Sequence, residues 1–246
     1  MNKKKLLSLA LVVIMIATLS FSTLAWFTDS DSVTNNFDIA GGENNNPDEI
    51  FSIDVMEAVD TDGDGDHDIT IGYDQDPEYK DNYTYENILP GDMLLKRPQT
   101  KNTGSYDQWV RMSITFDNAT YWVALMEKYG YTDMLDMLYM RDGVTPLKND
   151  TNWTYAPDET AIDNDQITYV FYYNKILEPG KTAVFFGNVL IPYQFDQYDM
   201  APFTNGDFRM VVTGEAIQVK NIEADTAMEA FAIVEGRATN GSAVIN

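Results

Sequence analysis

The residues best suited to chemistry form one acidic segment in which aspartate stands at every second position. The segment reads Asp60-Thr61-Asp62-Gly63-Asp64-Gly65-Asp66-His67-Asp68. Its first six residues match D-x-D-x-D-G, the opening of a calcium loop, in which spaced carboxylates and a glycine at the sharp turn surround one ion. We therefore predict a weak Ca²⁺ site. Its ligands would be Asp60, Asp62, Asp64, Asp66 and Asp68.

The segment departs from the EF-hand pattern at its twelfth position, which is Ile71 where a bidentate glutamate is expected. This departure favours a looser loop between two strands over a helix–loop–helix unit. The alternative is a solvated acidic hairpin, held open by repulsion between its carboxylates, that binds no ion. His67 is the one histidine of the chain, and an oxygen-rich site has little use for imidazole, so we assign it no catalytic role.

Composition excludes several classes of function. The chain has 246 residues, with 39 Asp+Glu, 16 Lys+Arg, one His, no Cys and a formal net charge of −23. Without cysteine there are no disulfides and no thiolate sites, and a single histidine cannot form the H-E-x-x-H site of a zinc peptidase, so no zinc is expected. Basic residues are too few to bind nucleic acid. Carboxylate pairs of the glycosidase kind arise by chance among so many acids, so we expect no catalytic residues and no enzyme.

The first 25 residues are typical of a secretory signal peptide. Lys3, Lys4 and Lys5 precede an uncharged run over 6–24, and Thr23-Leu24-Ala25 offers small residues at −3 and −1 for cleavage after Ala25. An uncleaved anchor is the alternative, because the apolar stretch is nearly long enough to span a bilayer. Cleavage predicts a protein secreted to the surface or exterior of a bacterium, which touches the membrane only through its signal peptide.

The remaining chain is patterned mostly as strands. Alternation of apolar and polar residues predicts strands at 33–39, 51–59, 68–73, 108–116, 166–173, 182–192 and 208–219. Pro90-Gly91 and Pro179-Gly180 suit type II turns that lead into strands. Helical spacing appears instead near 119–140, with Asp117 or Asn118 as its cap, and near 225–234. With loops at 43–48 and 148–165, the pattern predicts a mainly β fold, an antiparallel β-sandwich over 44–246 with short helical insertions.

Four motifs stand in order along the chain. The first motif is the junction 24–31, which runs into 36–39. The second is Leu89-Pro90-Gly91-Asp92, followed by 101–105 and 109–111. The third is 177–183, and the fourth is 212–218, which leads to 224–231. Each is weak alone, but the ordered set resembles the TasA and camelysin family of exported biofilm-matrix proteins, whose signal peptides are handled by a dedicated peptidase, SipW. The resemblance implies a jelly-roll-like sandwich that assembles into extracellular fibres of the biofilm matrix.

In such fibres the N-terminal segment of one subunit is thought to complete a sheet of its neighbour. Segment 26–43 fits this role, because a strand-like stretch on a flexible tether can add to an open sheet edge. The partner would be another copy of the chain, head to tail, or a related matrix protein. The alternative is that the segment folds back as the first strand of its own domain. The residues expected to carry self-assembly are Trp26, Phe27, Val33, Phe37 and Ile39.

Two other functions remain open. A monomeric cell-surface binding module, an adhesin or carbohydrate-binding sandwich, would need a groove lined by exposed aromatic residues such as Trp109, Trp122 or Trp153. A hydrolase would need a deep pocket with two carboxylates of divergent pKa.

Overall fold

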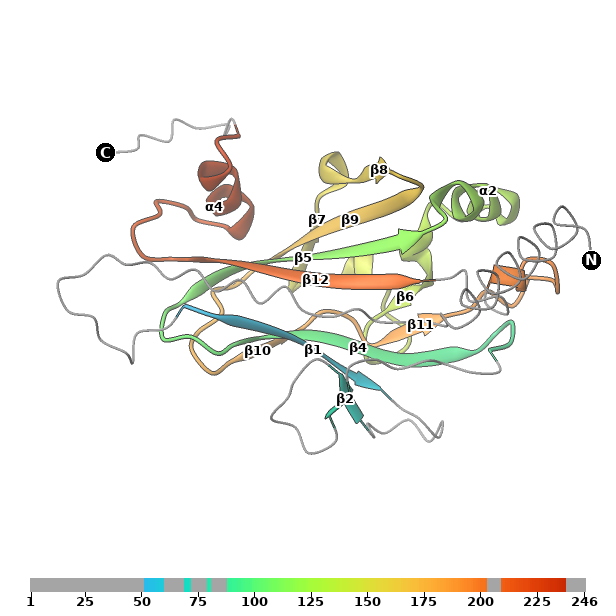
Figure 1. Ribbon diagram of the computed structural model, residues 1–246, viewed down its shortest axis with the longest axis horizontal. Helices are drawn as coiled ribbons and strands as arrows, with labels where there is room; N and C mark the ends of the chain where they lie inside the picture. Colours follow the sequence, from blue (N-terminus) through green and yellow to red (C-terminus); the bar gives the residue numbers. More distant parts are fainter. Residues whose placement is uncertain (1–50, 60–68, 72–78, 81–87, 203–208, 238–246) are drawn as a thin grey trace, which may run out of the picture.

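The computed structural model describes residues 51–59, 69–71, 79–80, 88–202 and 209–237. These residues form two sheets that pack face to face, with the strands running along the long axis of the molecule (Figure 1). The predicted mainly β sandwich with short helices is therefore confirmed. The predicted signal peptide, N-terminal strand and acidic loop lie outside the described residues.

The first sheet has the strand order β3-β2-β1-β4-β11-β6, with β10 also paired to β4. All its pairs are antiparallel except β2 with β3. Its strands are β1 (Ile53–Val59), β2 (Ile69–Ile71), β3 (Tyr79–Lys80), β4 (Met93–Asn102), β6 (Leu138–Tyr139), β10 (Thr182–Val184) and β11 (Asn188–Leu190).

The second sheet is antiparallel throughout, with the order β12-β5-β9-β7 and with β8 also paired to β9. Its strands are β5 (Gln108–Asp117), β7 (Trp153–Tyr155), β8 (Ala161–Asp163), β9 (Gln166–Tyr173) and β12 (Met210–Gln218). The central strand β5 alternates buried and half-buried residues over 110–117, as predicted for a strand with one face in a core, whereas β9 is buried on both faces over 169–172.

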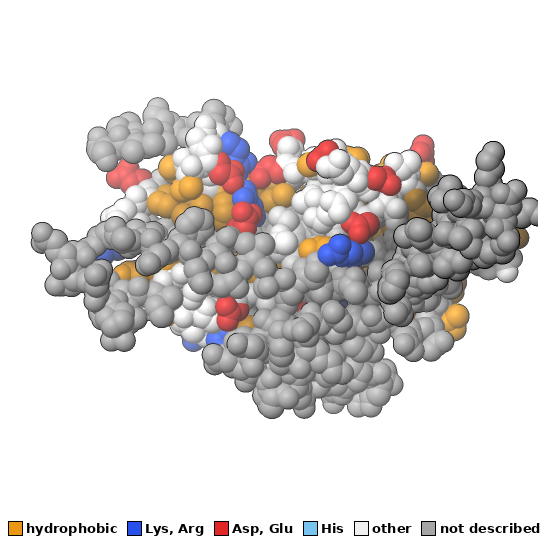
Figure 2. All heavy atoms as spheres, in the orientation of Figure 1, with side chains coloured by type: hydrophobic (Ala, Val, Ile, Leu, Met, Phe, Trp, Pro, Cys, Tyr) orange, Lys and Arg blue, Asp and Glu red, His pale blue; other side chains and the backbone are white. Residues whose placement is uncertain are grey.

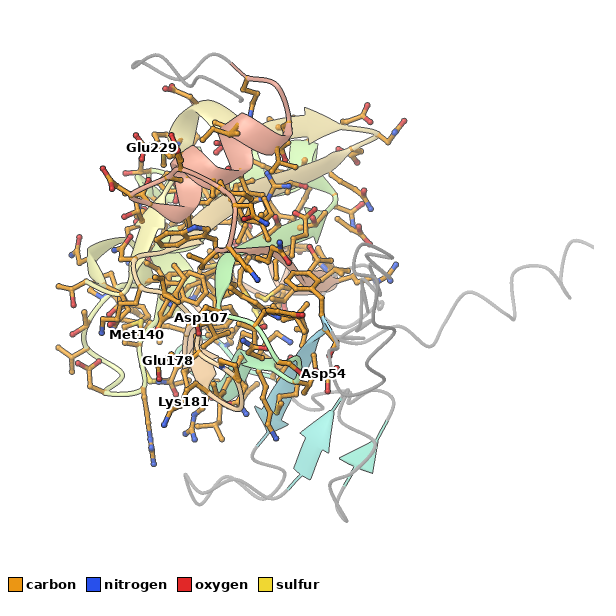
Figure 3. All side chains as sticks on the ribbon, turned by 90° about the vertical axis from the view of Figure 1, so that its left-hand side faces the viewer. Asp54, Asp107, Met140, Glu178, Lys181 and Glu229 are labelled. Atoms are coloured by element: carbon orange, nitrogen blue, oxygen red, sulfur yellow. The ribbon has the colours of Figure 1, made fainter. Side chains whose placement is uncertain are left out.

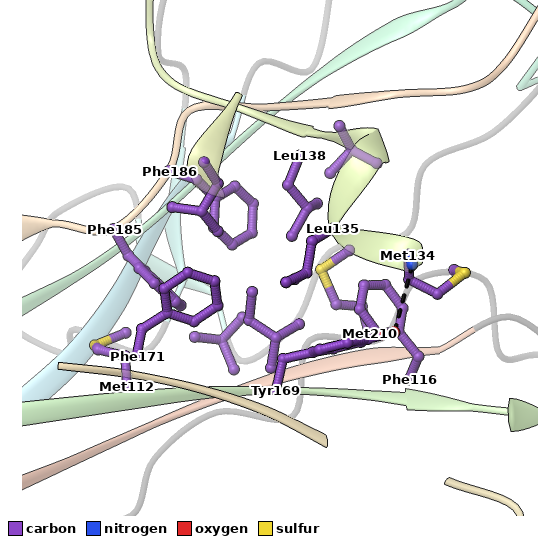
Figure 4. Packing of buried hydrophobic residues seen from close by; sticks show 14 of the residues in the cluster. Met112, Phe116, Met134, Leu135, Leu138, Tyr169, Phe171, Phe185, Phe186 and Met210 are labelled. Carbon is purple, nitrogen blue, oxygen red and sulfur yellow. Dashed lines mark hydrogen bonds between the residues drawn. The ribbon is translucent and has the colours of Figure 1, made fainter. Parts of the chain in front are cut away.

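The main core lies between the sheets and is rich in aromatic residues. Phe116 of β5 and Tyr169 of β9 meet edge to face, with 6.1 Å between ring centroids, and Phe171 contacts Phe185 in the same way at 5.1 Å (Figure 4). Leu135 and Leu138 close this core from one side. A Cβ at Gly214 of β12 would lie 2.6 Å from Cγ2 of Val55 in β1, in the facing sheet, so only glycine fits there without movement.

The helix predicted near 119–140 is shorter in the structure and is capped by a different residue. Helix α2 (Ala119–Tyr129) ends at Gly130, whose φ of 75° is the left-handed conformation that glycine adopts readily. Asn118 occupies the N-cap position but its side chain makes no cap bond, so this part of the prediction is wrong. Asp165 caps the helix from a distant loop, since its side chain and its carbonyl accept from the backbone N–H groups of Thr120 and Ala119 at 2.8 Å.

Beyond Gly130 the expected helix gives way to a 3₁₀ turn, η1 (Met134–Met137), and then to β6. The second helix, α4 (Ala227–Val234), forms as predicted and is capped by Thr226, whose hydroxyl accepts from the N–H of Glu229. Seen end on, α4 with its Glu229 lies on the side of the second sheet that faces away from Asp54 and β1 (Figure 3). It is short, and it covers only part of that outer face.

Both Pro-Gly turns are confirmed. Gly91 and Gly180 have φ of 93° and 75°. The N–H groups of Asp92 and Lys181 close the two turns onto the carbonyls of Leu89 and Glu178, each at 3.1 Å. Each turn therefore places its glycine where the backbone needs a positive φ.

Two strand assignments from sequence were wrong. Segment 148–165, expected to be a loop, holds β7, β8 and the 3₁₀ turns η2 (Leu147–Asn149) and η3 (Pro157–Glu159). β7 and β8 are three residues long, and both pair with β9. Three residues are too few for an alternation of apolar and polar residues to be recognised, so the sequence alone did not predict these strands. Segment 182–192, expected as one strand, divides into β10 and β11, both of which pair with β4.

Candidate functional site

The most distinctive feature of the described structure is the free edge of β12. This strand has nine residues and pairs with β5 alone among the described strands. The other terminal or side strands, β3, β6, β7, β8 and β10, have two or three residues each. A long strand at a sheet edge presents a row of unpaired backbone groups that another strand can join.

The hydrogen bonds to β5 show which residues of β12 face outward. The N–H of Val219 donates to the carbonyl of Asp107 at 2.9 Å, and the N–H of Asp117 donates to the carbonyl of Arg209 at 3.1 Å. In an antiparallel ladder, directly opposed residues alternate between bonded and non-bonded pairs. Odd-numbered residues of β12 therefore bond to β5, and even-numbered residues turn their N–H and C=O groups to the open edge. These residues are Met210, Val212, Gly214, Ala216 and Gln218.

The free edge of β12 lies beside a second edge, in the other sheet. β1 pairs with β4 along its whole length but with β2 only at residues 57–59, so its first half is also an edge among the described strands. Figure 1 shows β12 and β1 next to one another, one in each sheet. A strand added to β12 would thus extend the second sheet on the side where the first sheet is also incomplete.

Side chains along β12 suit a partner strand that continues the core. Met210, Val212 and Ala216 are at most 6% exposed and face inward, whereas Glu215 on the outer face is held by Arg111 of β5 at 2.7 Å. An added strand would therefore meet a buried apolar inner face, and an outer face on which Val211 and Ile217 alternate with Thr213 and Glu215. The buried inner face would set its register, because a one-residue slip reverses every side chain.

The residues predicted from sequence to bind calcium or to carry self-assembly all lie outside the described residues. The structure does place β2 beside β1 in antiparallel register, so the acidic segment joins two paired strands. In the part of the chain that the structure describes, no three acidic or histidine side chains cluster as metal ligands would. Calcium at Asp60, Asp62, Asp64, Asp66 and Asp68 stays a prediction.

The three tryptophans that could have lined a sugar-binding groove are buried. Trp109, Trp122 and Trp153 are 5%, 0% and 2% exposed. Trp153 donates its indole N–H to the carbonyl of Val184 at 2.8 Å, which fixes it between the sheets. These residues pack the fold, so none of the three lines an exposed groove of the kind that a carbohydrate-binding module would need.

A charged cluster anchors the loop before β12 to helix α2. Asp199, whose side chain is 8% exposed, accepts from Lys128 Nζ at 2.9 Å, from the Tyr129 hydroxyl at 2.5 Å and from the N–H of Asp196 at 3.0 Å. Burial raises the pKa of this carboxyl, but the bonds from Asp196, Tyr129 and Lys128 outweigh burial and leave the pKa below its ordinary value of 3.8. The cluster is fully satisfied and fits a structural role.

The lowered pKa of Asp199 gives a pH-dependent contribution to stability. A carboxylate with a depressed folded-state pKa stabilises the fold above pH 3.8, and this contribution disappears as the pH falls through the lowered pKa. We expect Asp199→Asn to destabilise the protein at neutral pH, and we expect the difference from the parent to shrink as the pH falls below 3.8. Urea unfolding of both proteins across this pH range measures the difference. A difference that stays constant with pH would contradict the assignment.

In the described part of the chain no helix combines the length and apolar character needed to cross a membrane. No known family model matches the sequence, and no curated protein is significantly similar to it.

Proposed function

We propose that this chain is a secreted structural protein that assembles head to tail into extracellular fibres of a bacterial biofilm matrix. In this proposal segment 26–39 of one subunit adds to the free edge of β12 in the next subunit. The observation that carries it is the row of outward-facing backbone groups on β12, nine residues long beside an apolar inner face. The order of motifs shared with the TasA and camelysin family supports the same function.

The chemistry of the edge suits strand addition better than catalysis. Each backbone hydrogen bond to an added strand contributes about 0.5–1.5 kcal/mol net, and burial of alternate apolar side chains adds to this. A subunit that donates its own segment to a neighbour leaves its own edge for the next subunit. Such contacts are heterologous and produce open filaments unless they close into a ring. Calcium binding at the acidic segment would stiffen the link between β1 and β2 by relieving repulsion.

The proposal predicts that filaments need both the donor segment and the acceptor edge. We expect Phe37→Asp to abolish filaments by placing a charge on the buried face of the donor. Ala216→Pro should do so by removing an outward N–H of β12 that does not bond to β5. Proline is tolerated on the free side of edge strands, so the monomer should remain folded. Negative-stain microscopy and circular dichroism of the protein beginning at Trp26, with and without millimolar Ca²⁺, test both points.

A mixture of the two variants gives the sharper result. Phe37→Asp keeps a working edge and Ala216→Pro keeps a working donor, so an equal mixture should form dimers by size-exclusion chromatography and nothing longer. Ile217→Pro is the matched control, because its N–H bonds to β5 and its loss should lower the melting temperature.

If the unaltered protein stays monomeric under every condition, the fibre proposal fails and a monomeric surface binding module becomes the better explanation. If Phe37→Asp unfolds the monomer, the segment belongs to its own core.

A further inference from the structure

Helix α4 covers a small apolar surface on the outer face of the second sheet. The cluster beneath it is separate from the main core between the sheets. Phe231 of α4 meets the ring of Tyr172 from β9 edge to face, with 5.7 Å between centroids. The buried members of this cluster are Trp109, Ala156, Val170, Tyr172, Ala227, Ala230 and Phe231.

Ion pairs hold the end of α4 to the sheet in addition to this apolar packing, and Arg111 of β5 is their centre. Its guanidinium lies 2.7 Å from Glu235, at the end of α4, and 2.7 Å from Glu215 of β12. The same guanidinium lies over the ring of Phe231, 4.4 Å from its centroid. Arg111 therefore joins the helix to two strands at once, and Figure 2 shows basic and acidic side chains side by side next to α4.

Arg237 forms the second half of this network, just beyond α4. Its Nη1 lies 2.6 Å from Glu159 of η3, and its Nη2 donates to the Tyr172 hydroxyl at 3.0 Å. Tyr172 in turn donates to Glu159 at 2.7 Å. The network thus brings three glutamates, at 159, 215 and 235, around two arginines. Without Arg237, three acids would face Arg111 alone.

While α4 covers the sheet, the burial of the Trp109 side chain also costs free energy. This residue is 5% exposed, and its indole N–H has no hydrogen-bond partner. A buried donor without a partner costs about 1–3 kcal/mol relative to one that meets water. Release of α4 would remove this cost. An eight-residue helix is also marginal on its own, so α4 depends on the sheet for its structure.

We propose that α4 is a releasable strap: it is held to the outer face of the second sheet by the Arg111 and Arg237 network, and it leaves that face while the sandwich stays folded. Release exposes the apolar cluster around Trp109 and Tyr172. The segment between β12 and α4 can absorb the movement at Asn221, which has a left-handed φ of 69°. This inference goes beyond fibre assembly and does not depend on it.

Hydrogen exchange on the mature protein with Arg237→Gln tests the strap. We expect amides of α4 to exchange about tenfold faster or more, because the variant loses the contacts of Arg237 with Glu159, Tyr172 and Glu235 and leaves excess negative charge beside the helix. Amides of β5 and β9 should keep the protection they have in the parent. Raising NaCl should accelerate exchange in α4 of the parent selectively, because screening weakens partly exposed ion pairs.

Lys148→Gln is the matched control. It removes one positive charge from a comparable network, in which Lys148 lies 2.6 Å from Asp136 and 3.3 Å from Asp133, away from α4. It should leave exchange in α4 unchanged. The proposal is overturned if Arg237→Gln leaves α4 protected, or if α4, β5 and β9 accelerate together, because the helix would then be part of the cooperative unit.

Discussion

Lys96→Met is expected to lower the free energy of unfolding by about 3–5 kcal/mol, the usual cost of breaking a buried ion pair by removing one partner. Lys96 of β4 and Glu57 of β1 are both 2% exposed, and 2.5 Å separates Nζ from Oε2. The second carboxylate oxygen of Glu57 has no hydrogen-bond partner. Without the lysine, the buried carboxylate would lose its neutralising charge.

Urea unfolding monitored by circular dichroism measures this effect. Lys101→Met is the control on the same strand, because Lys101 is only half-buried and its loss should cost less than about 1 kcal/mol. The double variant Lys96→Met with Glu57→Leu should recover most of the stability, because a well-packed apolar pair replaces a buried ion pair at little cost. A loss below about 1 kcal/mol in the single variant would show that the pair does not act as a buried one.

The pair also constrains how β1 and β4 align. Glu57 lies opposite Pro98, and Lys96 lies opposite Val59, so the two charges meet diagonally. A slip of one residue would turn Glu57 to the other face of the sheet and leave Lys96 without its partner. We therefore expect the unfolding transition of Lys96→Met to broaden as well as to shift, and the same urea experiment reports both.

Gly187→Ala is expected to destabilise the protein by about 3 kcal/mol, at the upper end of the usual cost of overpacking. A Cβ at Gly187 would lie 2.5 Å from Cα of Arg141 and 2.6 Å from its backbone nitrogen. The obstruction is backbone and cannot rotate away. Gly187 also donates to the carbonyl of Tyr139 at 2.9 Å and accepts from the N–H of Lys96 at 3.2 Å, so the chain is held on both sides.

Thermal and urea unfolding of two glycine variants separate crowding from backbone conformation. Gly130→Ala has nothing within 4 Å of the new Cβ, but its φ is 75°, so it should lose only about 1–2 kcal/mol. Gly187→Ala should lose more than Gly130→Ala. The opposite order would mean that the segment before β11 moves to accept a side chain.

The sequence by itself determined the strands that have one apolar face and the turns that need glycine. β5 alternates inward apolar residues with outward polar ones over 110–117, and β9 is rich in β-branched and aromatic residues, so their residues define both strands without knowledge of their neighbours. The turns at Pro90-Gly91 and Pro179-Gly180 follow from the fixed φ of proline and the positive φ open to glycine. The spacing of apolar residues near 225–234 also predicted helix α4.

Tertiary structure alone decided β4, the short strands and the free edge. The inward face of β4 carries Lys96, Pro98, Thr100 and Asn102, so it has no hydrophobic pattern to read; Lys96 is accommodated only because Glu57 lies on the adjacent strand. Whether a strand such as β12 is central or at an edge depends on sheet order, which brings together residues distant in sequence. The burial of Trp109, Trp122 and Trp153 has the same origin, because side-chain type does not say which face of a strand meets a core.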